Sequence, residues 1–477
     1  MNHIKKTKII ASIWPATRTE EKIIDLYKAG VNVIRINFSH ADYDNSSRII
    51  DIVHRLNSQG ITKLALLWDL KWPEIRTGDY EGNKTYQKGD TFKIRIDGSK
   101  VSGNDQFCDY PYFVEDSNIG DIVKIESGLF DVVIKEKKED HVVVEALHDA
   151  SLKQRRHINL PALTLKLPWL IDQDKENVLF CIEKQFDYIA MSFVRSKEHV
   201  TELRTLLDEH GASHIYIISK IENQEWLNNI QDIVEASDGI MVARWDLGIE
   251  IPIETIPVRQ RSIVKLCRAQ WKISIIATQM IESMMEHPFP TRAEVSDIFN
   301  AIVQKTDAIM LSGETALWQY PIEAVQMMKK IAIQAESVID YKHEDFEHKR
   351  YSESDIDKKY LIKSAIEIAE KNNISAIITF TKSGKLARIA AAYRPKTPLF
   401  AFTNRRSTLT QTALLFGVTS RFLNFHHHSE VLGEALQTLI AKGDITGQDK
   451  IIVITDTKKW DIEIPTMEII SVKNFLE

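Results

Sequence analysis

Five charged side chains in the sequence are of the types that bind phosphate groups and the metal ions that accompany them. They are Arg35, Arg76, Lys220, Glu222 and Asp246. An arginine fork matches the oxygens of a phosphate, and a lysine ammonium supplies a point charge for a phosphoryl group in transfer. Carboxylates are hard oxygen ligands that suit Mg²⁺. Together the five suggest phosphoryl transfer, which depends on positioning and charge neutralisation more than on covalent chemistry. A structural ion pair between Lys220 and Glu222 is the alternative.

These side chains belong to segments that end or follow candidate strands. Short apolar runs predict eight strands: Lys8–Ile13, Val31–Asn37, Leu64–Asp69, Tyr188–Met191, His214–Lys220, Gly239–Val242, Ile273–Ala277 and Ala308–Leu311. Helical patterns lie between them, including Lys197–Glu209 and Pro257–Ala269. Eight such units fit a closed (β/α)₈ barrel, in which functional groups gather at the carboxyl ends of the strands. An open doubly wound sheet is the alternative architecture.

The alternation of strands and helices is interrupted once and then followed by a second α/β unit. Residues 78–160 show β-type alternation, as in Thr91–Ile96, and predict a small all-β domain inserted between two barrel parts, residues 1–77 and 161–340. A charged segment over residues 340–357 predicts a linker. Residues 355–477 predict a separate C-terminal α/β domain that begins with a helix over Lys358–Lys371.

Composition narrows the class of protein. The chain has 477 residues and a formal net charge of −6, so the basic balance typical of nucleic-acid-binding proteins is missing. Three cysteines without a CxxC pair favour buried thiols in a reducing compartment. The sequence shows neither a secretory signal nor an apolar run long enough for a membrane span. We therefore expect a cytoplasmic protein that binds no nucleic acid and no membrane.

Segments at the predicted strand ends resemble the signature segments of the pyruvate kinase family. They are Arg35–His40, Lys71 with Pro73–Arg76, Lys220–Asn223, Ala277–Met280, Pro290–Glu294 and Met310–Thr315. The resemblance extends over essentially the whole chain. It implies glycolytic phosphoryl transfer from phosphoenolpyruvate to ADP, giving pyruvate and ATP, with Mg²⁺ or Mn²⁺ and often K⁺. It also implies a homotetramer in which the inserted β domain acts as a lid.

The resemblance further implies a role for each site residue. Lys220 would stabilise the phosphoryl group in transfer, Arg35 and Arg76 would hold phosphates, and Glu222 and Asp246 would hold the divalent metal. Thr278 and residue Trp245 would lie beside the substrate carboxylate, with Thr278 also on the proton path to the enolate. Nucleotide contacts would come from Pro15, Asn37, His40 and Arg76. The K⁺ ligands would be Asn37, Ser39, Asp69 and the carbonyl of Leu70, and Glu74 is typical of K⁺-dependent members.

Tryptophan stands at positions where the family pattern expects glycine: Trp14, Trp72, Trp226, Trp245, Trp271 and Trp318. Glycine at a turn permits positive φ and a close approach of backbone to ligand, whereas tryptophan adds a Cβ atom and a large indole. We expect strained backbone at Trp14, Trp72 and Trp245, with the indole of Trp245 filling substrate space or displacing Asp246. The expected result is a recognisable fold with reduced stability and weak or absent turnover. The alternative is that each indole turns to solvent.

A loop in the C-terminal domain predicts an effector site. Thr381, Lys382, Ser383, Gly384 and Lys385 precede a helix and resemble the phosphate-cradling loop of the family's effector site. A sugar phosphate or a nucleotide is the implied ligand, and a plain helix cap by Ser383 is the alternative. Two other functions stay open: a non-catalytic assembly or effector-binding protein of the same fold, and another Mg²⁺-dependent barrel enzyme acting on phosphoenolpyruvate or a keto acid.

Overall fold

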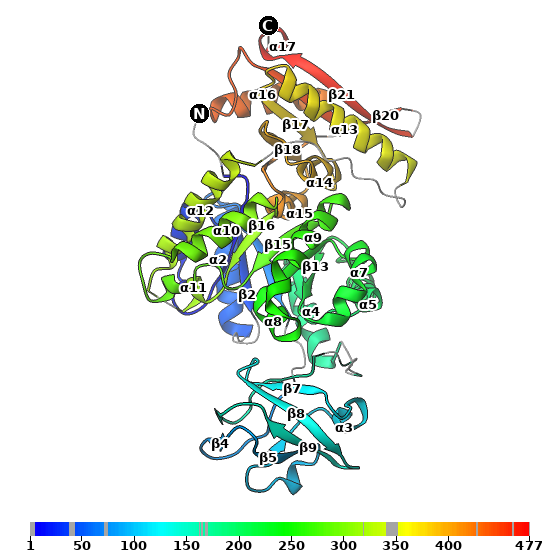
Figure 1. Ribbon diagram of the computed structural model, residues 1–477. Coiled ribbons are helices and arrows are strands. Elements are labelled where there is room, and N and C mark those ends of the chain that lie inside the picture. The colour runs from blue at the N-terminus through cyan, green and yellow to red at the C-terminus, as the bar shows by residue number, and fades with distance from the viewer. Residues whose placement is uncertain are drawn as a thin grey trace.

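Eight parallel strands close into a barrel in the computed structural model of the chain (Figure 1). The structure describes residues 5–37, 43–70, 75–161, 163, 166, 170–317, 319–339, 352–425, 428–459 and 462–476. Around the barrel the strands are β1 (Lys8–Ser12), β16 (Ala308–Leu311), β15 (Ile273–Ala277), β14 (Gly239–Ala243), β13 (Tyr216–Ile221), β12 (Tyr188–Met191), β3 (Ala65–Asp69) and β2 (Val33–Asn37). The closed order confirms the predicted barrel over the open sheet.

Burial on both faces explains why apolar runs located these strands. Every residue of β1 is buried, and the same is true of β14 and β15. Neighbouring residues serve different cores: Ile9 packs with the surrounding helices, whereas Ile10 belongs to a cluster that reaches the C-terminal domain. Double burial of this kind is typical of parallel sheets.

Helices follow the strands and cover the outside of the barrel. They are α1 (Glu20–Ala29), α2 (Tyr43–Ser58), α4 (Asp172–Glu183), α5 (Lys197–Glu209), α6 (Gln224–Asn228), α7 (Ile230–Ala236), α8 (Arg244–Glu250), α9 (Ile256–Ala269), α10 (Arg292–Val303), α11 (Gly313–Ala316) and α12 (Pro321–Ser337). Helix α10 begins with a capping box, in which Thr291 Oγ1 accepts from Glu294 N at 3.2 Å and Glu294 Oε2 accepts from Thr291 N at 2.7 Å. This cap fixes the start of α10 beside the strand ends.

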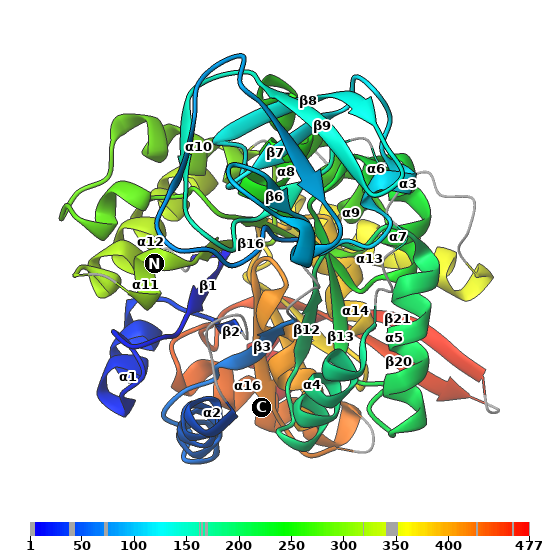
Figure 2. The same cartoon turned by 90° about the horizontal axis from the view of Figure 1, so that it is seen from below.

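The β-type segment forms a separate half-barrel after the carboxyl end of β3. Its elements are β4 (Lys84–Tyr86), β5 (Thr91–Arg95), β6 (Gln106–Phe107), α3 (Phe113–Asp116), β7 (Ile122–Ile125), β8 (Phe130–Lys137), β9 (His141–Ala146), β10 (Ala150–Leu152) and β11 (Ile158–Asn159). Six of these strands share one sheet in the order β11-β7-β8-β9-β5-β6. Figures 1 and 2 show this insert lying over the end of the barrel that is opposite the C-terminal domain.

The C-terminal domain is a mixed five-stranded sheet in the order β19-β18-β17-β20-β21. Its elements are α13 (Glu353–Lys371), β17 (Ala376–Phe380), α14 (Lys385–Ala392), β18 (Leu399–Thr403), α15 (Arg406–Gln411), β19 (Val418–Phe422), α16 (His428–Ala441), β20 (Lys450–Lys459), β21 (Ile462–Ser471) and α17 (Val472–Leu476). Helix α13 begins at Glu353, within the last residues of the predicted linker, and Ser352 Oγ accepts from Asp355 N at its start. Residues 340–351 of that linker lie outside the described residues.

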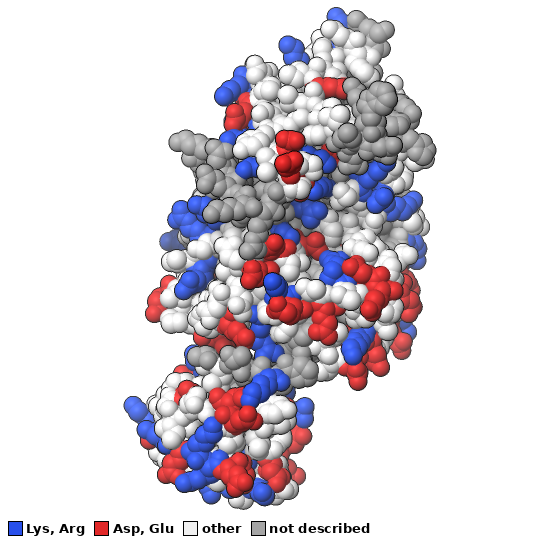
Figure 3. Space-filling view, turned by 90° about the vertical axis from the view of Figure 1, so that its right-hand side faces the viewer, with Lys and Arg blue, Asp and Glu red and all other residues white. Residues whose placement is uncertain are grey.

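Two properties of the surface bear on possible partners. Across the ranges that the structure describes, no helix combines the length and hydropathy needed to cross a membrane. On the face drawn in Figure 3, acidic and basic side chains are intermixed. Intermixed charges of this kind give that face no extended field of one sign.

Candidate active site

Lys220 lies at the centre of a buried network at the carboxyl ends of the barrel strands. Its Nζ atom is 2.8 Å from Glu222 Oε1 and 3.4 Å from Asp69 Oδ1, and it donates to Ser192 Oγ at 2.8 Å. These partners come from the ends of β13, β3 and β12. Burial favours the neutral amine, but the charges of Asp69, Glu222 and Asp246 outweigh it and raise the pKa of Lys220. The ammonium therefore stays charged at every physiological pH.

Arg35 shares the carboxylate of Asp69 with Lys220. Its Nε and Nη2 atoms lie 2.8 and 2.7 Å from Asp69 Oδ2, and its Nη1 donates to Ser12 Oγ at 2.7 Å. Although burial alone would raise the pKa of Asp69, Lys220 and Arg35 hold it below its usual value. One anion thus fixes two cations from neighbouring parts of the barrel.

Glu222 and Asp246 form a second, purely acidic feature beside Lys220. Glu222 is buried, and its Oε2 accepts from Phe193 N at 2.7 Å. Burial raises the pKa of Asp246 to about 7, repulsion from Glu222 adds to the rise, and Lys220 opposes it. Two carboxylates that repel each other fit a divalent cation, which commonly takes one or two carboxylates together with substrate oxygens. Among the described residues, no group of three or more His, Cys, Asp or Glu side chains could hold a metal ion.

Thr278 lies in a strained turn that Arg244 supports. Thr278 and Gln279 have positive φ values of 65° and 51°, which cost on the order of 1–3 kcal/mol each. The carbonyl of Thr278 accepts from Arg244 Nη2 at 2.7 Å, and Arg244 Nη1 is 2.6 Å from Asp297 Oδ2. Thr278 Oγ1 accepts from the backbone N–H of Trp245 at 2.9 Å. The turn after β15 and the first turn of α8 are therefore joined directly.

The expectation of strained backbone at Trp245 is wrong. Residue 245 lies in the first turn of α8, and its φ is not among the positive values. Trp14 likewise has no positive φ, whereas Trp271 has a φ of 55°. Residue Trp245 is 45 % exposed, so its side chain is not packed into the core. Trp72 and Trp318 lie outside the described residues.

Arg76 contacts residues of the insert and pairs with His157 in an isolated β-bridge. Arg76 lies at the junction between barrel and insert, where its backbone N donates to Asp109 Oδ1 at 2.6 Å and its Nη1 donates to the carbonyl of Arg155 at 2.8 Å. The residues brought together at the strand ends are Arg35, Lys220, Glu222 and Asp246.

The residues predicted to bind nucleotide and K⁺ are only partly described. Asn37 and Asp69 face each other in the register of β2 and β3, and the carbonyl of Leu70 accepts from Ser192 Oγ at 3.0 Å. These oxygens match the donor chemistry of a monovalent cation. Pro15 is exposed just after β1. Ser39, His40 and Glu74 lie outside the described residues.

The sequence alone assigned no role to several polar residues of this network: Ser12, Ser192, Arg244 and Asp297. Serine is too common a residue to indicate a site by itself. Only the positions of β1 and β12 in the barrel bring the hydroxyls of Ser12 and Ser192 to the site. Arg244 carried a usable signal, because it follows β14 directly and is nearly fully buried. A buried arginine requires partners, which Thr278 and Asp297 supply.

The predicted effector loop forms the N-terminal approach to α14. Gly384 has a φ of 76° and is the cap residue of α14, and its N–H donates to Thr381 Oγ1 at 2.9 Å. The alternative cap by Ser383 is therefore wrong. Thr408 Oγ1 donates to the carbonyl of Lys382 at 2.8 Å, and Lys385 forms an ion pair with Asp355. The exposed positions of the loop are Lys382 and Ser383.

Comparison with known proteins decides the family. The family model described as "Pyruvate kinase, barrel domain" matches residues 4–325, and that described as "Pyruvate kinase, alpha/beta domain" matches residues 359–470. The chain belongs to the pyruvate kinase family. Members are phosphotransferases that typically use divalent and monovalent cations, and the K⁺ requirement varies among them.

Individual pyruvate kinases match nearly the whole chain. The enzyme of Borreliella burgdorferi is 40% identical over 99% of this chain and 98% of its own length. That of Geobacillus stearothermophilus is 38% identical over 94% of this chain and 77% of its own length. A crystal structure of a pyruvate kinase from Cryptosporidium parvum superposes with a TM-score of 0.92 at 33% identity, covering 98% of this chain and 96% of that one. These matches span the barrel, the insert and the C-terminal domain alike.

Proposed function

We propose that the carboxyl ends of the barrel strands transfer the phosphoryl group of phosphoenolpyruvate to ADP, giving pyruvate and ATP. The observation that carries the proposal is the shared carboxylate of Asp69, which holds both Arg35 and Lys220, with Glu222 at 2.8 Å from Lys220 Nζ. Cations fixed in advance stabilise a phosphoryl group without reorganisation during the reaction, and such preorganisation is a large part of phosphoryl-transfer catalysis.

The remaining roles in the proposal are those that membership of the family implies. Lys220 stabilises the phosphoryl group in transfer, Arg35 holds its oxygens, and Arg76 serves the nucleotide phosphates from the junction with the insert. Thr278 and the N–H of Trp245 lie beside the substrate carboxylate, and the Thr278 hydroxyl lies on the proton path to the enolate. When bound by Glu222 and Asp246, Mg²⁺ or Mn²⁺ supplies positive charge to the substrate oxygens. Asn37, Ser39, Asp69 and the carbonyl of Leu70 hold K⁺, and Pro15, Asn37 and His40 contact the nucleotide.

We also propose that tryptophan replaces a family glycine at residues 14, 72, 226, 245, 271 and 318, and that Trp14, Trp72 and Trp245 reduce turnover. Support comes from residue 245, where the backbone N–H contacts Thr278 and Asp246 follows directly. Because Trp245 is largely exposed to solvent, its effect on turnover would act through the position of its backbone N–H and of Asp246.

Regulation and assembly complete the proposal. We infer that the loop Thr381–Lys385 binds the phosphate of a sugar phosphate or nucleotide, because Lys382 and Ser383 are exposed beside a backbone that only glycine adopts easily at residue 384. We further propose a cytoplasmic homotetramer with domains at residues 1–77, 78–160, 161–340 and 355–477. All three cysteines are free and buried, which fits a reducing compartment.

Replacing the central lysine tests the reaction. In an assay of pyruvate formation from phosphoenolpyruvate, ADP and Mg²⁺, Lys220→Met should lower kcat at least ~100-fold, because an electrostatic donor to the transition state is lost. Lys265→Met, at an exposed position on α9, is the matched control and should leave kcat unchanged. A Lys220→Met variant that keeps more than a tenth of the control rate would contradict the proposal. Binding of phosphoenolpyruvate without turnover in the unmodified chain would favour a non-catalytic assembly protein instead.

A further inference from the structure

The turn after β12 contacts both members of the ion pair between Lys220 and Glu222. Ser192 Oγ accepts from Lys220 Nζ at 2.8 Å, and the next backbone N–H, that of Phe193, donates to Glu222 Oε2 at 2.7 Å. Ser192 is 6% exposed, so water competes little for these contacts. Two consecutive residues of one turn therefore hold the lysine and the glutamate from the same side.

The donors and acceptors around Ser192 permit only one arrangement. A serine hydroxyl has a single hydrogen, and Ser192 donates it to the carbonyl of Leu70 at 3.0 Å. The oxygen lone pairs are then left to accept from Lys220, whose ammonium can only donate. The result is a directed chain from Lys220 through Ser192 to the carbonyl of Leu70, and each bond in such a chain polarises the next.

The three partners of Lys220 are not equivalent. An ammonium has three N–H groups, and here they face Glu222 at 2.8 Å, Ser192 at 2.8 Å and Asp69 at 3.4 Å. The contact with Asp69 is the longest. The N–H group of Lys220 that faces Asp69 is therefore the one most readily turned to a substrate oxygen. Ser192 is the neutral partner among the three. It fixes the ammonium without cancelling the charge that a phosphoryl group needs.

We propose that Ser192 is a positioning residue for phosphoryl transfer, which holds the ammonium of Lys220 in the orientation that meets the phosphoryl group. Without the hydroxyl, Lys220 settles between the two carboxylates of Asp69 and Glu222, and its charge is directed away from the substrate. The inference rests on the proposed role of Lys220 and adds a residue whose side chain need not touch the substrate.

The backbone of the turn supports this assignment. Phe193 has a φ of 49°, a left-handed conformation that residues other than glycine rarely adopt. Strain of this kind persists where the surrounding structure determines it and is concentrated at functional sites. In this conformation the N–H of Phe193 orients Glu222, so that its other oxygen meets Lys220. Both oxygens of the glutamate are thereby fixed before any ligand binds.

A graded series of substitutions at Ser192 tests the proposal. Loss of one hydrogen bond to a charged group that acts in the transition state should lower kcat about 10- to 100-fold in Ser192→Ala. The KM for phosphoenolpyruvate should stay within about threefold, because the loss falls on the transition state and not on substrate binding. Ser192→Thr keeps a hydroxyl and should recover most of the rate, and Ser192→Cys, with a weaker hydrogen-bonding group, should lie between.

A double-mutant cycle separates positioning through Lys220 from a general structural role. In a Lys220→Met background, Ser192→Ala should lower the remaining kcat less than threefold, because the ammonium that it positions is gone. A loss equal to that in the unmodified chain would overturn the inference, and so would Ser192→Ala with an unchanged kcat. A thermal midpoint is recorded for each variant, and Ser192→Cys, with nearly the volume of serine, replaces Ser192→Ala in the cycle if the alanine variant does not fold.

The same data distinguish failure of this inference from failure of the proposed function. If Lys220→Met loses turnover while Ser192→Ala retains it, only the inference about Ser192 is wrong. If Lys220→Met retains turnover, the proposed function itself is wrong. Loss of turnover in both, with recovery in Ser192→Thr, supports both.

Discussion

At the scale of single residues, the network at the strand ends depends on a few shared groups. Asp69 serves Arg35 and Lys220, and Thr278 serves both Arg244 and the backbone of residue 245. A displacement of about 1 Å in such a site can cost on the order of 10²-fold in rate. Residue 245 therefore matters more for geometry than for backbone strain, since Trp245 has an ordinary helical φ.

On the proposed effect of the tryptophans, replacing residues 14, 72 and 245 with glycine should raise the rate of pyruvate formation at least ~10-fold, because a misplaced group in such a site lowers the rate strongly. Trp460→Gly, at a tryptophan that is not among the positions proposed to replace glycine, is the matched control and should leave the rate unchanged. The measurement is steady-state turnover at saturating phosphoenolpyruvate and ADP. Equal rates for the unmodified chain and the triple variant would contradict the proposed effect of the tryptophans.

At the scale of elements, β12 connects the site to the C-terminal domain. Its carboxyl end carries Ser192, and Asp187 immediately precedes it at the other end. Asp187 accepts from Leu66 N at 2.8 Å and from the hydroxyl of Thr410 on α15. Burial raises the pKa of Asp187 to about 7, although both hydrogen bonds oppose the rise. A titratable carboxyl therefore lies where the barrel meets α15.

The raised pKa of Asp187 predicts how stability depends on pH. Between pH ~3.9, the pKa of Asp187 in the unfolded chain, and about pH 7, its pKa in the folded chain, only the folded chain keeps this carboxyl protonated. The contribution of Asp187 to the free energy of unfolding is therefore lost as the pH rises through that range. Asp187→Asn cannot titrate. Relative to the unmodified chain, Asp187→Asn should therefore have a higher thermal midpoint at pH 8 than at pH 5. In the titrating range, the difference in the free energy of unfolding should change by on the order of 1 kcal/mol per pH unit.

Thermal unfolding across pH 5–8 checks this expectation, with Asp208→Asn on the exposed face of α5 as the control. The control should keep the pH dependence of the unmodified chain. If Asp187→Asn keeps it as well, the carboxyl of Asp187 does not titrate in this range.

The elements also show how far the sequence could be interpreted. The barrel strands were predictable because their two buried faces leave apolar runs, and their ends located Arg35, Lys220, Glu222 and Asp246. Strand β21 was missed because Pro465 interrupts its pattern, and the proline is tolerated since β21 is the edge strand of its sheet. Ser192 and the left-handed φ of Phe193 depend on how β12 sits beside β13, which no local pattern records. The domain boundaries and residue roles remain predictions.

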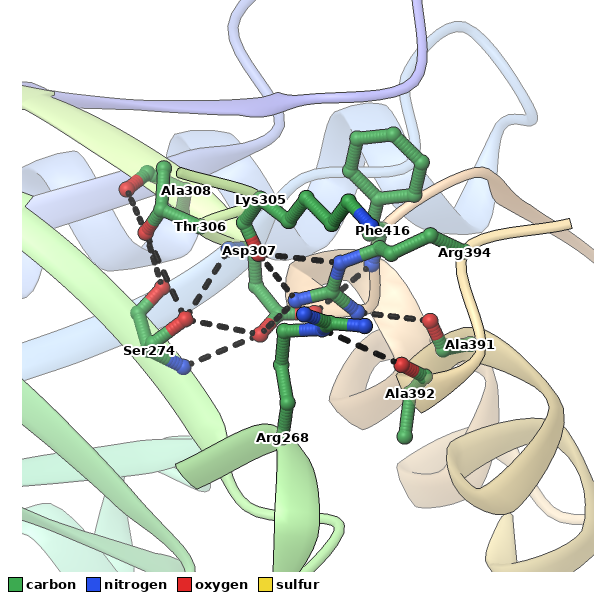
Figure 4. A network of polar contacts seen from close by, with 10 residues as sticks. All are labelled: Arg268, Ser274, Lys305, Thr306, Asp307, Ala308, Ala391, Ala392, Arg394 and Phe416. Carbon is green, nitrogen blue, oxygen red and sulfur yellow. Dashed lines mark hydrogen bonds and ion pairs between the residues drawn. The ribbon is translucent and has the colours of Figure 1, made fainter. Parts of the chain in front are cut away.

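At the scale of the whole molecule, a buried ion pair joins the barrel to the C-terminal domain (Figure 4). Arg394 Nη2 is 2.8 Å from Asp307 Oδ2, and its Nε donates to the carbonyl of Lys305 at 3.0 Å. Asp307 also accepts from Ser274 of β15 and from the N–H of Phe416. These contacts fix the end of the barrel that faces away from the insert.

Arg394→Ala should lower the free energy of unfolding by about 3–5 kcal/mol, because it leaves Asp307 buried without its cation. Arg55→Ala removes the exposed pair with Glu20 and should cost less than ~1 kcal/mol. Urea unfolding followed by fluorescence compares the two variants. Similar small losses in both would show that the buried pair contributes little to joining the two domains.

We propose that one phosphate and one divalent cation meet at the ends of β2, β13 and β14. Diffraction at the manganese absorption edge, from crystals grown with Mn²⁺ and phosphoenolpyruvate, tests it most directly. We predict one ion about 2.1 Å from carboxylate oxygens of Glu222 and Asp246, with the phosphate within hydrogen-bond distance of Lys220 and Arg35. An ion bound elsewhere, or a phosphate that contacts neither cation, would contradict the account.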